Sequence, residues 1–208
     1  MDFYCERINL NFFNEPLNII SNIFFLICSI IIFKRYRKIN INNEFYIFPI
    51  CVFLLSFGSS SFHSYPNKFT LLCDIIPIFV FCIFFAFTIN KNIIKINLTK
   101  NIFFILIYIF LSLFLPTIVN FDFLNGSQYY LSNFLLLNFY TFILKNNKLI
   151  IKILIKSVIF FSIALFFRTI DNFICNFLNI GTHYLWHLFS SILLFYLCQI
   201  FVKVQKLK

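Results

Sequence analysis

Charge is scarce in this sequence. Lys, Arg, Asp and Glu make up 12% of its 208 residues, less than half the share of about 25% that is typical of soluble domains. Hydrophobic residues make up 61%, including 35 Phe, and the mean hydropathy is +0.91. A soluble domain could not bury this much apolar surface. The composition therefore excludes a soluble globular protein and predicts a polytopic membrane protein.

Several functional motifs are also missing. None of the seven cysteines pair as Cys-x-x-Cys, which argues against a thiolate zinc site. No basic run is interleaved with base-stacking aromatic residues, so we expect no nucleic-acid partner despite the net charge of +10. The apolar segments show no paired broken-helix or inverted-repeat pattern, which would be typical of a transporter.

Seven apolar stretches are each long enough to span, or nearly span, a bilayer as a helix, which takes about 17–25 residues. They predict an all-α chain that forms one membrane domain over residues 1–208. The seven transmembrane helices are expected near 17–33, 45–63, 71–89, 102–119, 129–145, 149–168 and 182–202.

The distribution of Lys and Arg predicts how these helices are oriented. Fourteen of the 17 basic residues fall on one side of the predicted bilayer, and the other three are Arg7, Lys68 and Arg168. Because basic loops stay in the cytoplasm, we expect an extracytoplasmic N-terminus and a cytoplasmic C-terminus. The cytoplasmic loops are short, and the sequence implies no protein partner. All three histidines fall on the extracytoplasmic side.

The histidines are the first candidate site. His183 and His187 lie four residues apart at the start of the last span, so a helix places both imidazoles on one face. One interpretation is an interfacial aromatic belt shared with Tyr184 and Trp186. The other adds His63, at the end of the second span, as a third ligand. Three imidazoles with one open position are typical of catalytic zinc.

A base for such a site must come from elsewhere in the chain. The interior of His183–His187 is Tyr-Leu-Trp, which lacks the Glu of the His-Glu-x-x-His motif. Asp74 is the candidate base, because a short connection separates it from His63. The alternative is that Asp74 caps the start of its own helix. Ser59 and Ser60 precede His63 by about one helical turn, so at least one of them is expected on the same face.

Two further pairs lie on the extracytoplasmic side. Glu6 and Glu15 are carboxylates that could hold a hard cation through oxygen ligands. Cys5 and Cys175 both fall outside the predicted spans. In an oxidising compartment they could form a disulfide that attaches the N-terminal arm to the loop before the last span.

These segments together resemble the alkaline ceramidase family. The matching segments, in chain order, are Tyr4-Cys-Glu6, Asn14-Glu15-Pro-Leu-Asn18, Ser59-x-x-x-His63 with Asp74 eleven residues later, and His183-Tyr-Leu-Trp-His187. That family consists of seven-helix intramembrane zinc amidases, in a wider superfamily with the adiponectin-type receptors. The variant found here is most similar to bacterial members.

The resemblance implies a role for each candidate residue. The implied roles are zinc ligation by His63, His183 and His187, catalysis by Asp74, Ser59 and Trp186, a Cys5–Cys175 disulfide, and calcium binding by Glu6 and Glu15. One departure concerns calcium, because Phe3 stands where the family has an acidic residue and Asp2 is one position off.

The resemblance also implies an activity. The expected substrate is a long-chain N-acyl lipid in the bilayer, ceramide or a ceramide-like lipid, cleaved to a fatty acid and a sphingoid-type amine. One alternative is a receptor-like or lipid-binding protein with structural zinc. The other is a zinc hydrolase of a different lipid amide or ester.

Overall fold

The computed structural model describes residues 4–8 and 13–205, so Asp2 and Phe3 lie outside the described part. Within that part the chain is helical and contains no β-strand. The long helices are α2 (Ile23–Lys38), α3 (Ile47–Ser64), α4 (Lys68–Ile89), α5 (Leu98–Ile118), α6 (Leu131–Ile143), α7 (Ile151–Ile174) and α8 (His183–Gln205). The shorter elements are α1 (Pro16–Ser21), the 3-10 turns η1 (Asn43–Tyr46), η3 (Asp122–Leu124) and η4 (Ser127–Tyr130), and the π-helical turn η2 (Asn90–Ile94).

The described residues contain seven long helices, as expected, and six of the seven are long and apolar enough to cross a membrane. The exception is α6, which was expected to span 129–145. Its 13 residues cover roughly 20 Å, short of a hydrocarbon core of about 30 Å. The chain enters α6 through left-handed conformations at Asn125 and Gly126 and through the turn η4, whose last two residues occupy the start of the predicted span.

Two helix starts and one helix end decide where the candidate residues lie. Pro16 opens α1 at the position where its missing N–H removes no hydrogen bond. Asn67 caps α4 in a capping box, because its Oδ1 accepts from the N–H groups of Phe69 and Thr70. Asp74 is therefore not the cap of α4 and lies on the second turn of the helix. Helix α7 runs to Ile174, beyond the predicted end at residue 168.

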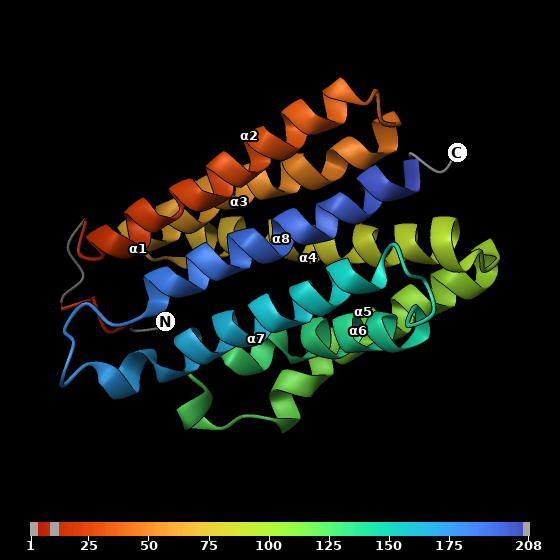
Figure 1. Cartoon of the computed structure of the whole chain (residues 1–208). Coiled ribbons are helices and arrows are strands. Elements are labelled where there is room, and N and C mark those ends of the chain that lie inside the picture. Colours follow the sequence, from red (N-terminus) through yellow and green to blue (C-terminus); the bar gives the residue numbers. More distant parts are fainter. Residues whose placement is uncertain (1–3, 9–12, 206–208) are drawn as a thin grey trace.

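Helix α8 is the centre of the bundle (Figure 1). It packs along α7 and contacts α2 and α3, while α3 pairs with α4 and α6 packs against α7. The end of α3, the short helix α1 and the start of α8 meet at one end of the bundle, together with the N-terminal arm. Residues far apart in the sequence thereby meet at that end.

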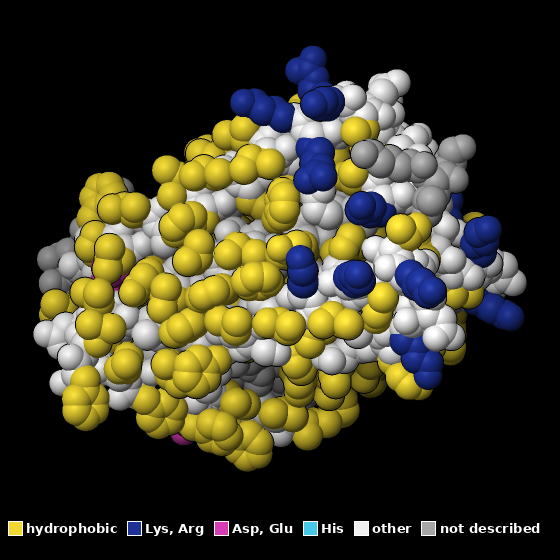
Figure 2. Space-filling model, in the orientation of Figure 1, with side chains coloured by type: hydrophobic (Ala, Val, Ile, Leu, Met, Phe, Trp, Pro, Cys, Tyr) yellow, Lys and Arg dark blue, Asp and Glu magenta, His cyan; other side chains and the backbone are white. Residues whose placement is uncertain are grey.

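The outer surface suits a lipid environment. Many Phe, Ile and Leu side chains of the six candidate spans are exposed, among them Phe103, Phe110 and Leu113 of α5. Figure 2 shows hydrophobic side chains over most of the visible face, and Lys and Arg gathered at the end where α8 finishes. The chain is therefore an integral membrane protein, with its basic residues concentrated at the end opposite the histidines.

Candidate metal centre

The three histidines meet at one end of the bundle. His63 comes from the last turn of α3, and His183 and His187 from the first two turns of α8. One ring nitrogen from each lies within 4.8 Å of the other two. The ring centroids are 4.7–5.2 Å apart, and each residue is at most 2% exposed. The structure thus brings together a local pair and a third histidine more than a hundred residues away.

Two of the rings are held at Nδ1. His63 Nδ1 is hydrogen-bonded to Oε2 of Glu15. His187 Nδ1 lies 2.7 Å from Oγ of Ser21, which donates its own proton to the carbonyl of Asn18 at 2.9 Å. A ring that donates at Nδ1 presents an unprotonated Nε2, which is the form that binds a metal.

The third ring is fixed differently. The backbone N–H of His183 donates to Oδ1 of Asp171 at 2.9 Å, and its ring stacks on Tyr4 with centroids 3.8 Å apart. Within the described residues, Nδ1 of His183 is buried without a hydrogen-bond partner. The position of this ring is therefore set by the start of α8 and by the N-terminal arm.

This donor set fits a transition metal such as zinc. Three buried imidazole nitrogens converge, and two of the rings carry the hydrogen bonds at Nδ1 that usually accompany ligation at Nε2. No carboxylate joins the cluster among the described residues, whereas calcium and magnesium require oxygen ligands. Three histidines leave a position open, as in catalytic zinc sites.

Ser59 and Asp74 line a cavity together with His183 and His187. Ser59 of α3 is 3% exposed, and Asp74 lines the same cavity from α4. Gly58 makes this approach feasible, because a Cβ at that position would lie 2.0 Å from the carbonyl oxygen of Cys73. The missing side chain lets α3 and α4 pack closely and brings the carboxylate to the histidine end.

The cavity continues from this polar end into the middle of the bundle. Its deeper walls are apolar and include Phe81 and Phe85 of α4 and Leu193 and Leu197 of α8. From His183 to Leu197 the helical rise amounts to roughly 21 Å. The arrangement offers a long apolar space that ends at two of the three histidines.

A family model described as ceramidase matches residues 3–207. The chain belongs to the ceramidase family. Among curated proteins, none matches the chain. Membership implies amidohydrolase activity on a lipid of the ceramide class in a membrane setting, and the three buried histidines could hold the metal ion.

Trp186 lines the same cavity beside His187 and is 6% exposed. Its ring packs against Tyr130 at 4.7 Å and lies under the guanidinium of Arg168 at 5.5 Å. Arg168 also faces the rings of Tyr4 and Tyr130. The tryptophan therefore forms a fixed wall of the cavity.

Arg168 and Asp171 lie at the same end of the bundle, although the sequence predicted no site role for them. Both are at least 96% buried in the last turns of α7, and Arg168 lines the cavity. Their spacing was the available signal. Two opposite charges three residues apart at the end of an apolar span are energetically unfavourable in a bilayer, and such residues usually have a function. Arg168 entered the prediction only as one of the three basic residues on the extracytoplasmic side.

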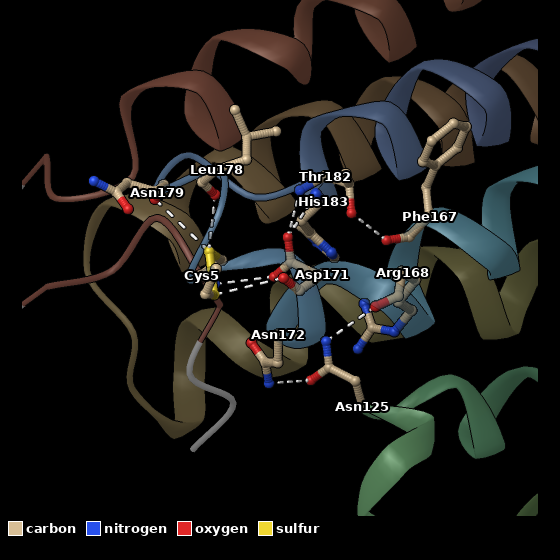
Figure 3. Close-up of a disulfide and its surroundings, with 11 residues drawn as sticks. Cys5, Asn125, Phe167, Arg168, Asp171, Asn172, Leu178, Asn179, Thr182 and His183 are labelled. Atoms are coloured by element: carbon tan, nitrogen blue, oxygen red, sulfur yellow. Dashed lines mark hydrogen bonds between the residues drawn. A yellow bond between two sulfur atoms is a disulfide. The ribbon is translucent and has the colours of Figure 1, made fainter.

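Asp171 and the disulfide attach the N-terminal arm to the end of α7 and the start of α8 (Figure 3). Cys5 is bonded to Cys175, as the sequence predicted, with Cα atoms 5.4 Å apart. The backbone N–H of Cys5 donates to Oδ2 of Asp171 at 2.9 Å, while Thr182 and His183 donate to Oδ1 at 2.6 and 2.9 Å. One carboxylate thus joins the arm to the start of α8.

The two glutamates expected to bind calcium lie beside the histidine cluster but are engaged by the protein. Glu6 accepts from the N–H groups of Leu17 and Asn18 at 2.7 and 2.9 Å. Burial raises the pKa of its carboxyl, and these two hydrogen bonds oppose that change. Glu6 thereby satisfies N–H groups at the start of α1, where Glu15 makes no capping bond.

Glu15 is 1% exposed and has three partners. Arg7 donates to Oε1, while His63 and Asn18 donate to Oε2, the latter at 3.0 Å. Burial alone would raise the pKa of this carboxyl, but the hydrogen bonds from His63 and Asn18 and the charge of Arg7 hold it below its usual value. The structure thus surrounds Glu15 with protein donors.

Proposed function

We propose that this ceramidase-family protein is an intramembrane zinc hydrolase. It would cleave the amide bond of ceramide or a ceramide-like N-acyl lipid to a fatty acid and a sphingoid-type amine. The observation that carries the proposal is the convergence of His63, His183 and His187 at the polar end of a long apolar cavity, which Ser59 and Asp74 also line. Family membership supports the reaction class.

Each residue of the site would have a separate role in the reaction. When bound, zinc would polarise the amide carbonyl and make a water molecule more acidic. Asp74 would accept the proton of the attacking water and deliver it to the departing amine. Ser59 would donate a hydrogen bond to the developing oxyanion. Trp186, fixed between Tyr130 and Arg168, would limit where the scissile amide can lie.

The apolar part of the cavity would hold the acyl chain. The walls formed by Phe81, Phe85, Leu193 and Leu197 offer hydrocarbon contacts and few hydrogen-bond partners. A long-chain lipid could place its tail along these walls while its amide reaches the histidine end. This shape favours N-acyl lipids over short soluble amides.

The reaction would take place on the extracytoplasmic side. The histidine end lies opposite the end where Lys and Arg gather (Figure 2), and basic residues favour the cytoplasm. The Cys5–Cys175 disulfide at the histidine end also suits an oxidising compartment.

Metal analysis and product release test the proposal together. The protein purified in detergent should contain one zinc per chain and should release fatty acid from at least one lipid in a panel of N-acyl sphingoid bases and other lipid amides. Mass spectrometry of the products identifies the substrate. Zinc without hydrolysis of any lipid amide would favour a receptor-like or lipid-binding protein with structural zinc.

A substitution separates the base from the metal site. Asp74→Asn should keep zinc and abolish turnover, because an amide cannot accept the proton. Asp122→Asn is the matched control, since Asp122 is an exposed acid outside the cavity. Full activity of the Asp74→Asn protein would refute the role of Asp74.

A further inference from the structure

Arg7 is a buried cation adjacent to the histidine cluster. Its side chain is 2% exposed. Its Nε donates to Oε1 of Glu15, and its Nη2 donates to the backbone carbonyl of His63 at 2.8 Å. One guanidinium therefore joins the N-terminal arm, the residue before α1 and the last turn of α3.

The backbone fixes Arg7 at this place. Its N–H donates to the carbonyl of Tyr4 at 3.0 Å and closes a turn over residues 4–7. Within that turn, Cys5 is bonded to Cys175 and donates its N–H to Asp171 (Figure 3). The disulfide and this carboxylate thereby hold the arm, and with it the guanidinium, against the bundle.

A calcium ion would compete with this arrangement. All four carboxylate oxygens of Glu6 and Glu15 accept hydrogen bonds from protein donors. Calcium takes roughly 6–8 oxygen ligands, so it would have to displace those donors. It would also have to share Glu15 with the positive charge of Arg7. The calcium site that the family resemblance implies does not fit these residues.

We propose that Arg7 is a built-in cation that replaces calcium in this protein and acts as a positioning residue for the metal centre. Arginine is always charged, and its planar fork lets two different nitrogens bind Glu15 and the carbonyl of His63. It holds the Glu15 carboxylate against the ring of His63. The geometry of one zinc ligand is then set by the chain and does not depend on the calcium concentration.

The role is one of positioning more than of stability. A buried ion pair gains little net stability, because removing both charges from water offsets their attraction. Within the described residues, Nη1 of Arg7 is also buried without a partner, which adds to the penalty. What the pair does provide is a fixed hydrogen bond at Nδ1 of His63, the kind of contact that orients a metal ligand.

Calcium binding by the wild-type protein is the first test. Protein prepared in calcium-free buffer is measured for bound radioactive calcium, and its melting temperature is recorded with and without added calcium chloride. We expect no stoichiometric calcium and no saturable rise in melting temperature. One calcium per chain, or a saturable rise, would overturn the inference. The hydrolase proposal would survive that result.

Substitution of Arg7 is the second test, and it rests on the proposed function because its readout is zinc affinity. Arg7→Met should weaken zinc binding by about 10- to 100-fold, the usual loss when a residue that orients a ligand is removed. Lys68→Met is the matched control, an exposed basic residue near the same end of the bundle. Arg7→Lys, which keeps the charge, should retain more zinc affinity than Arg7→Met.

A double substitution distinguishes positioning from stability. Arg7→Met combined with Glu15→Gln removes both charges, so its melting temperature should return toward that of the wild type while zinc affinity stays low. Unchanged zinc affinity in Arg7→Met would overturn the inference, as would equal losses in Arg7→Met and Arg7→Lys. Absence of zinc from the wild type would instead refute the hydrolase proposal and leave the calcium result standing.

Discussion

Asp171 offers the most direct test of how the metal centre is held in place. Its side chain is fully buried and accepts three backbone N–H groups, from Cys5, Thr182 and His183. Replacing it with alanine removes all three acceptors at once. The start of α8 loses the acceptor of two N–H groups, and the N-terminal arm loses the hydrogen bond that Cys5 donates.

The magnitude follows from the number of unsatisfied groups. Each buried N–H left without an acceptor costs at least about 1 kcal/mol, so Asp171→Ala should lose about 3 kcal/mol or more. For a chain of this size each kcal/mol lowers the melting temperature by about 2–4 °C. We therefore expect a fall of about 6–12 °C. Asp171→Asn keeps an acceptor for Thr182 and His183 and should lose about a third as much.

The assay combines a thermal melt in detergent with a zinc titration. Because His183 is the first residue of α8, fraying of that turn should also weaken zinc binding in Asp171→Ala. Asp122→Ala, at an exposed acid, is the control. If Asp171→Ala melts within the error of that control and binds zinc as tightly as the wild type, Asp171 does not hold the start of α8 in place.

Four further predictions concern the same end of the bundle. His187→Ala should lose stoichiometric zinc and hydrolysis, because two imidazoles remain, and mass-spectrometric metal analysis measures this. Ser59→Ala should keep zinc and KM while kcat falls by about 10²–10³ if Ser59 is an oxyanion donor, as steady-state kinetics would show. Gly58→Ala should lower both the melting temperature and hydrolysis, because its Cβ would lie 2.0 Å from the Cys73 carbonyl oxygen. Cys175→Ser should lower stability by about 2–4 kcal/mol, because a crosslink over 170 residues is lost, and a non-reducing melt measures the change.

Each of these predictions has a contrary result. Zinc retained at one per chain in His187→Ala would remove that residue from the metal site. An unchanged kcat in Ser59→Ala would place Ser59 outside the reaction. Gly58→Ala melting above the wild type would show that helix propensity outweighs the close packing of α3 on α4. No change in Cys175→Ser would show that the hydrogen bonds of the N-terminal arm, among them those to Asp171 and Glu15, hold it without the disulfide.

Local patterns in the sequence were sufficient to predict the helices, the shared face of His183 and His187, and the return of Asp74 toward His63. Runs of apolar residues predicted the helices because a bilayer imposes a minimum apolar length on any span. The helical period predicted that His183 and His187 share a face. The short connection after His63 predicted that Asp74 would return toward it, and the structure places Asp74 on the wall of the cavity that the other two histidines line.

The boundaries were less predictable where tertiary contacts decide them. The predicted span at 129–145 is the short helix α6, because a left-handed turn and η4 precede it. Helix α7 extends to Ile174 and carries Asp171 into the bundle, where backbone N–H groups from two other segments satisfy its carboxylate. Hydropathy alone favours ending that span at Arg168, before Asp171.

The sequence by itself determined a seven-helix membrane protein with a histidine pair on one helical face, because hydropathy and helical period depend only on neighbouring residues. The tertiary structure alone decided what holds the three rings. Ser21 reaches His187 across 166 positions and Glu15 reaches His63 across 48. It also decided that Glu15 pairs with Arg7. A buried polar group takes whichever partner packing brings within hydrogen-bonding distance, and no local spacing encodes that choice.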